Sequence, residues 1–279
     1  MRRRNPLLEP LTNTGTAVMR GIGLFGRFWT FAASAVANVP LEIASHRGWR
    51  RLLPQAYAIG TRSVPVIMAT GMFVGMVLVV QGWDQFQNAN LTDRLGGIVN
   101  ISVASELGPV LAGVMLAGRV GGALTAELGT MNVTEQLLAL RSMGADPIRY
   151  LVTPRFLACM VLAPLLTLYA NLMGAVGSWL VYTGVFGGDS EPFWSFTRDA
   201  IEMWDLGSGL TKAVFFGGFI GLISCYKGFN CRAGAEGVGR ACTEAFVTSF
   251  MVILALDFFL NFGLNGLYKS LYGFRQLLT

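Results

Sequence analysis

The feature that most constrains this chain is a run of 21 residues without a charged side chain, from Ser63 to Trp83. As an α-helix this run would be about 32 Å long, which matches the ~30 Å hydrocarbon core of a bilayer. Only 13% of all residues are charged and 53% are hydrophobic, whereas about 25% of the residues in a typical soluble domain are charged. The composition therefore predicts an integral membrane protein. It excludes a soluble enzyme and a nucleic-acid binder.

Further apolar stretches complete an all-α membrane fold with five predicted crossings. They cover about residues 63–83, 98–130, 154–184, 207–226 and 245–268, so that residues 63–279 form the transmembrane domain. Residues 1–62 are predicted to form a cytoplasmic N-terminal segment. Within it, Val18 to Leu41 combines aromatic and aliphatic residues with Arg20 and Arg27 on nearly the same helical face. This pattern favours an amphipathic helix in the headgroup plane, with a sixth crossing as the alternative.

Lysine and arginine counts predict the orientation. With a cytoplasmic N-terminus, the inner segments 1–62, 131–155 and 227–244 carry 9, 3 and 3 basic residues, and the outer segments 84–97, 185–212 and 269–279 carry 1, 2 and 2. Cytoplasmic loops are enriched in basic residues. A multi-pass protein with its N-terminus in the cytoplasm is therefore expected.

The chain lacks the residue patterns of several catalytic classes. His46 is the single histidine, so a zinc site or a Ser-His-Asp triad is not expected. The three lysines are Lys212, Lys227 and Lys269, and none follows a glycine, so the Gly-Lys ending of a Walker A loop is absent. We predict no metal, no cofactor and no ATP hydrolysis by this chain itself.

A short amphipathic helix is predicted between the second and third crossings, at about residues 132–144. Asn132 and Glu135 have the spacing of a capping box, and Gly144 suits the position after the last turn. Its apolar stripe comprises Val133, Leu137, Leu140 and Met143, and its polar rim comprises Glu135 and Arg141. The stripe would be buried against the membrane surface, against the protein's own core, or against a cytoplasmic partner.

Charged residues inside predicted crossings mark candidate functional sites, because a charge costs roughly 2.5–3.5 kcal/mol on insertion scales. Glu106 precedes Gly108 and Pro109, and the proline leaves a backbone carbonyl near Ser105 without its helical donor. We therefore expect a helix break beside a polar cavity. Arg119 and Asp257 lie at similar predicted depths and are expected to form an ion pair. Lys212, near an outer end, is expected to anchor its helix at the interface.

The predicted cavity combines a polar spot with apolar walls suited to acyl chains. Glu106 would either accept a hydrogen bond from a headgroup or control the helix geometry. The residues assigned to this cavity are Ser105, Glu106, Leu107 and Pro109 from the second crossing, with Met72, Met76 and Val79 from the first.

Several short sequence motifs in this chain are typical of one known protein family. They are Glu106-Leu107-Gly108-Pro109, Ala117-Gly118-Arg119-Val120-Gly121, Ala126-Glu127-Leu128-Gly129-Thr130-Met131 and Asp146-Pro147-Ile148-Arg149-Tyr150. Together they resemble the MlaE/YrbE family, the permease subunits of lipid ABC transporters that work with MCE proteins. One departure is Ser105, where proteobacterial members often have arginine.

The resemblance implies a homodimeric permease of a bacterial inner membrane that moves phospholipid or a related lipid. It implies two copies of a cytoplasmic ABC ATPase, an external MCE-domain lipid-binding protein and often a STAS-domain protein. Residues 131–145 would be the coupling helix that docks on the ATPase. Two alternatives stay open from the residues alone: an ion-coupled secondary transporter that uses the intramembrane charges, and a membrane scaffold that transports nothing.

Overall fold

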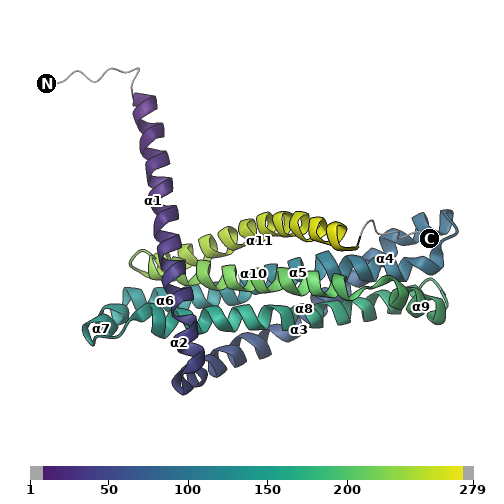
Figure 1. Ribbon diagram of the computed structural model, residues 1–279, viewed down its shortest axis with the longest axis horizontal. Coiled ribbons are helices and arrows are strands. Elements are labelled where there is room, and N and C mark those ends of the chain that lie inside the picture. The colour runs from purple at the N-terminus through teal and green to yellow at the C-terminus, as the bar shows by residue number, and fades with distance from the viewer. Residues whose placement is uncertain (1–8, 273–279) are drawn as a thin grey trace.

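The computed structural model describes residues 9–272, and this part of the chain is helical with no strand (Figure 1). The α-helices are α1 (Glu9–Ala37), α2 (Val39–Ala44), α3 (His46–Asn88), α4 (Leu95–Ser102), α5 (Gly108–Leu116), α6 (Gly122–Val133), α7 (Gln136–Ser142), α8 (Thr153–Gly184), α9 (Ser190–Ala200), α10 (Met203–Phe229) and α11 (Ala235–Tyr272). A 3-10 turn, η1 (Thr92–Arg94), precedes α4. Two π-helical turns join helices end to end, η2 (Val103–Leu107) between α4 and α5 and η3 (Ala117–Gly121) between α5 and α6, and a third, η4 (Ile148–Val152), leads directly into α8.

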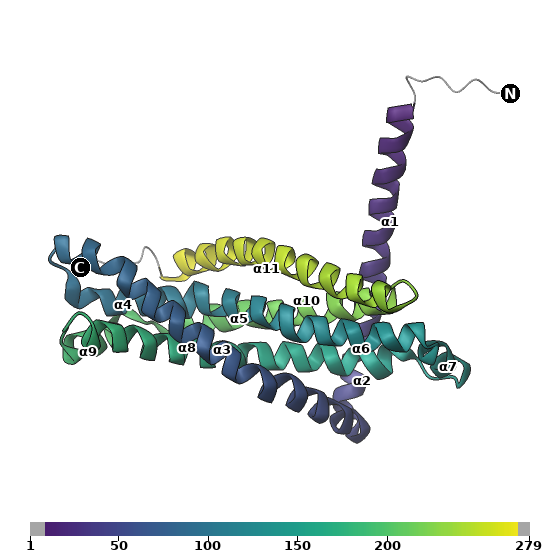
Figure 2. The same cartoon turned by 180° about the vertical axis from the view of Figure 1, so that it is seen from behind.

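Five continuous helical stretches in the described residues are long and apolar enough to span a membrane. They are Gly48–Asn88, Thr92–Val133, Ile148–Gly184, Met203–Phe229 and Ala235–Leu271. They run roughly along one long axis (Figures 1 and 2), with α7 at one end of the bundle and α9 at the other. The predicted all-α membrane fold with five crossings is confirmed. Each helix extends beyond the predicted crossing, because charged residues at the ends of an apolar run do not end a helix.

Close packing of α3 against α8 forms one side of the bundle. A β-carbon at Gly71 would collide with the backbone of Ala170, and one at Gly75 would collide with the backbone of Gly174. Small residues four apart let two helix backbones approach closely in a membrane. This glycine pair therefore packs within one chain, and α8 is in contact with α3 on one side and α10 on another.

Helix α1 lies crosswise to the bundle at its α7 end (Figures 1 and 2). Its buried Ala32 and Ala35 belong to a core cluster that also includes Val152 and Leu222. Large apolar side chains on α1 are exposed, namely Met19, Ile22, Phe25 and Trp29. Although α1 has 29 residues, it is not among the stretches suited to span a membrane. Its crosswise direction and exposed apolar residues agree with the predicted position in the headgroup plane, which stays a prediction.

At the α9 end, a separate aromatic and aliphatic cluster ties α9 to the bundle. Phe193 of α9 is fully buried beside Tyr182 of α8, with 5.0 Å between ring centroids. Val79 belongs to this cluster, and the partly buried Met76 packs against it. These two residues, assigned from sequence to the lipid cavity, therefore help to hold the α9 end together.

Candidate functional site

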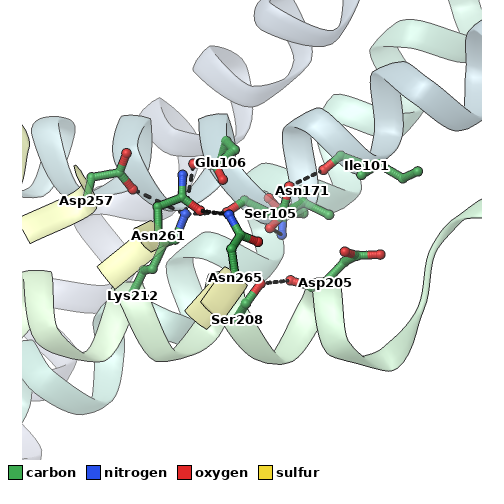
Figure 3. A network of polar contacts seen from close by, with 11 residues as sticks. Ile101, Ser105, Glu106, Asn171, Asp205, Ser208, Lys212, Asp257, Asn261 and Asn265 are labelled. Carbon is green, nitrogen blue, oxygen red and sulfur yellow. Dashed lines mark hydrogen bonds and ion pairs between the residues drawn. The ribbon is translucent and has the colours of Figure 1, made fainter. Parts of the chain in front are cut away.

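A lysine buried in the membrane-spanning region is the centre of the site. The side chain of Lys212, on α10, is 1% exposed. Its Nζ lies 2.8 Å from Glu106 Oε2, to which it donates a hydrogen bond, and 3.3 Å from Asp257 Oδ1 on α11. Figure 3 shows the three charged groups converging from η2, α10 and α11. Because a buried charge is costly unless it is paired, these contacts explain how Lys212 is accommodated.

The π-helical turn η2 supplies a further contact to this lysine. Pro109 has no N–H group to donate to the carbonyl of Ser105, four residues earlier, as an α-helix would require. Lys212 Nζ donates to that carbonyl at 3.1 Å instead. The expected break is thus a single π turn within a continuous helical stretch, and π turns of this kind are frequent at functional sites.

Two close approaches hold η2 in place. A β-carbon at Gly209, one turn before Lys212, would collide with the carbonyl of Ala104. A β-carbon at Gly108 would collide with the side-chain oxygen of Asn171 on α8. The absence of side chains at these two glycines therefore lets α10 and α8 pack directly against the π turn, so that Lys212 reaches Glu106.

A cavity of about 290 Å³ opens beside this cluster, between the beginning of α10 and the end of α11. It is lined by Ile101, Ser105, Glu106, Trp204, Asp205, Ser208, Asn261, Leu264, Asn265, Tyr268 and Lys269. Two asparagines one turn apart on α11 face it, and Asn265 Nδ2 donates to Asn261 Oδ1 at 3.2 Å. The wall therefore combines amide, carboxylate, ammonium and hydroxyl groups with aliphatic and aromatic surface.

The structure places only part of the sequence-assigned cavity residues here. Ser105 and Glu106 line the cavity, whereas Leu107 and Pro109 do not, and neither do Met72, Met76 and Val79 of α3. The Ser105 hydroxyl donates within its own helix, to the carbonyl of Ile101. Sequence reasoning missed the α10 and α11 residues. The signal available for them was the pair Asn261 and Asn265, two amides at helical spacing in an apolar run.

Two expectations about intramembrane charges need correction. The predicted Arg119–Asp257 ion pair is not formed: Asp257 lies beside Lys212, and Arg119 is exposed without an ion pair to any residue that the structure describes. Lys212 is not an interfacial anchor, because it is buried. Equal depth along two helices does not place their side chains on facing sides, which the packing of the bundle decides.

The predicted docking helix is shorter and differently oriented. Helix α7 begins at Gln136, and Glu135 has a φ of 60°, so the expected capping box is absent. Leu137 is 5% exposed and packed inside the chain, whereas Leu138 is 59% exposed and Met143 73%. Of the other residues assigned to docking, Val133 and Leu140 are half-buried, and Glu135 and Arg141 are exposed. The outward apolar surface of α7 and the residue that follows it is therefore formed by Leu138 and Met143.

Comparison with known proteins agrees with this architecture. The family described as Permease MlaE matches residues 52–262. A probable ABC transporter permease protein of Rickettsia typhi is 38% identical over 242 residues, which cover 87% of this chain and 91% of the relative. The intermembrane phospholipid transport system permease protein MlaE of Haemophilus influenzae is 38% identical over 211 residues, covering 75% and 81%. The chloroplastic protein TRIGALACTOSYLDIACYLGLYCEROL 1 of Arabidopsis thaliana is 38% identical over 213 residues, covering 76% and 61%. The chain belongs to the MlaE permease family.

Proposed function

We propose that this chain is the membrane-spanning permease subunit of an ABC transporter for phospholipid or a related lipid. It would pass lipid between the inner membrane and an external MCE-domain protein, driven by a separate ATPase. The observation that carries the proposal is the buried Lys212 with its two carboxylates beside a cavity of mixed polarity. Intramembrane charges that line a cavity mark substrate pathways. The name of the Haemophilus relative supports phospholipid as the substrate class.

The cavity chemistry suits an amphipathic ligand better than an ion. Ile101, Leu264 and Trp204 offer apolar surface, while the amides of Asn261 and Asn265 offer donors and acceptors for a headgroup. Glu106 has a 36% exposed side chain, and its charge is offset by Lys212. The carboxylate therefore repels a lipid phosphate less than a bare one would, and it can accept a hydrogen bond from a headgroup donor.

Assembly with other subunits is the second part of the proposal. Arg119 is exposed on a membrane-spanning stretch of the single chain, and such charges face protein or water rather than lipid. We infer that a second copy of this chain covers this face, as a homodimer. Two ATPase subunits would dock on the exposed α7 surface of Leu138 and Met143, which places α7 and the N-terminus in the cytoplasm. An MCE-domain protein would meet the α9 end, and a STAS-domain protein would accompany the ATPase.

The experiment reconstitutes the complete transporter in vesicles and follows the transfer of a fluorescent phospholipid to the purified MCE-domain partner upon addition of ATP. Glu106→Leu removes both the charge and the hydrogen-bonding capacity at the cavity and is expected to abolish transfer. Glu106→Gln keeps the side-chain shape and the hydrogen-bonding capacity but removes the charge, so it tests the role of the charge alone. Glu236→Gln on α11, exposed and outside both the cavity lining and the α7 surface, is the matched control and should transfer lipid at the wild-type rate.

A second function is favoured by the same charge cluster, because carboxylates and a lysine within a membrane also form proton relays. In that case lipid transfer would follow a proton gradient imposed on vesicles that contain this chain without ATPase. ATP-dependent transfer that is insensitive to the gradient supports the ABC permease. Wild-type transfer by Glu106→Leu would contradict a role for the cavity in either mechanism.

A further inference from the structure

A second polar cavity, of about 320 Å³, lies at the opposite end of the bundle, where α1 meets α7, η4 and the end of α10. Its lining is Arg27, Thr30, Phe31, Ser34, Arg141, Ile148, Tyr226, Phe229 and Asn230. The volume is at the small end of the range for ligand pockets. Nothing in the transport site described above uses this cavity.

Aromatic packing holds the walls of this pocket together. Phe31 of α1 packs against Tyr226 and Phe229 of α10, with ring centroids 5.5 Å and 5.6 Å apart. This contact fixes the rotation of α1 about its own axis. Arg27, Thr30 and Ser34, at helical spacings of three and four residues, consequently share the face that lines the pocket. The large apolar residues Met19, Ile22 and Phe25 of α1 are exposed instead.

The pocket is electropositive. Its described lining contains the guanidinium groups of Arg27 and Arg141 and no acidic residue, and neither arginine forms an ion pair with a residue that the structure describes. The hydroxyl groups of Thr30 and Ser34 donate to backbone carbonyls of α1. The two guanidinium groups, with five N–H donors each, are therefore the charged groups that can bind an incoming anion.

We propose that this pocket binds the phosphate of an anionic phospholipid headgroup from the leaflet at the α7 end. Arginine pairs with phosphate through parallel, charge-assisted hydrogen bonds. The exposed apolar residues of α1 place the pocket at headgroup level, since they would enter the acyl boundary beside it. A bound lipid would join Arg27 of α1 to Arg141 of α7. The proposal rests on the predicted position of α1 in the headgroup plane and on the proposed function of the chain as a membrane-spanning permease.

The test measures lipid binding by the purified full chain in detergent, without ATPase and without transport. Native mass spectrometry gives the dissociation constants of short-chain phosphatidylglycerol and of zwitterionic phosphatidylcholine. The wild type is expected to prefer phosphatidylglycerol. The double variant Arg27→Gln/Arg141→Gln should bind it about tenfold more weakly or worse, the loss expected for one charge-assisted hydrogen bond. Arg149→Gln, an exposed arginine on η4 outside the pocket lining, is the matched control.

Three outcomes would overturn the proposal. The first is unchanged phosphatidylglycerol binding by a double variant whose melting temperature equals that of the wild type. The second is binding of inorganic phosphate alone to the wild type with the same dissociation constant as phosphatidylglycerol, which would assign the pocket to a free anion. The third is a double variant that keeps the lipid but, in a separate purification of the whole transporter, loses the ATPase, which would assign the arginines to an acidic segment of that partner. A failure of lipid transfer in the reconstituted transporter would leave these binding constants unaffected.

Discussion

Lys212 shows how a single residue decides the electrostatics of the membrane interior. It is the cation of a cluster whose other members, Glu106 and Asp257, come from separate helices. Its third contact, the carbonyl of Ser105, exists because Pro109 cannot donate to that carbonyl. Pro109 and Lys212 are 103 positions apart in the sequence. Lys212 supplies the donor that Pro109 lacks, and the Ser105 carbonyl supplies an acceptor to the buried ammonium group. This is why the lysine can be buried at all.

Removing this lysine should destabilise the bundle more than removing the whole cluster. Lys212→Met leaves two carboxylates without a counter-charge. Breaking a fully buried pair typically costs ~3–5 kcal/mol, and the partial exposure of Glu106 and Asp257 should make the cost here smaller. We expect a clear fall in melting temperature in detergent. The triple variant Lys212→Met/Glu106→Gln/Asp257→Asn should recover most of it, because no unpaired charge remains. A triple variant that is less stable than Lys212→Met would show that the ion pairs themselves hold the helices together.

At the scale of helices, apolar runs predict which segments cross the membrane but not how their faces meet. The five crossings follow from charge-free stretches of bilayer length. The ends of the helices do not follow from these stretches. Helix α10 begins at Met203 rather than at residue 207, so Lys212 lies more than two turns inside it. The cavity wall on α11 was missed for a related reason. Which side of a helix faces a neighbour depends on glycine contacts such as Gly209 against Ala104, and these contacts join residues distant in the sequence.

Helix α7 gives a prediction at this scale, because its two adjacent leucines differ in environment. Leu138→Asp places a charge on the exposed surface, so it should leave the melting temperature unchanged and release a co-purified ATPase. Leu137→Asp buries an unpaired charge and should lower stability and expression before any effect on docking can be seen. Measurement of both melting temperature and ATPase recovery separates the two. Full ATPase recovery with Leu138→Asp would exclude this surface as the docking site.

Over the whole molecule, the two ends of the bundle carry different chemistry. The α7 end presents the crosswise α1, the electropositive pocket and exposed apolar residues on a short helix. The α9 end is closed by the cluster around Phe193, and the cavity beside Lys212 is lined by the helix that follows α9. Because Lys212 is buried in the membrane-spanning region, it no longer counts among the basic residues of the outer segments. The excess of basic residues in the inner segments over the outer ones therefore becomes larger. The distribution of basic residues thus favours a cytoplasmic position for the α7 end.

Single-cysteine labelling tests that orientation. In a variant whose four native cysteines are replaced, Met143→Cys would report on the α7 end and Met203→Cys on the α9 end, both at highly exposed positions. Positive-inside bias predicts that a membrane-impermeant maleimide reaches position 203 in right-side-out membrane vesicles and position 143 in inverted ones. Labelling after detergent solubilisation controls for reactivity, since both positions should then react. The reverse pattern would place α7 outside the cell, where no cytoplasmic ATPase can reach it, and would exclude the proposed coupling.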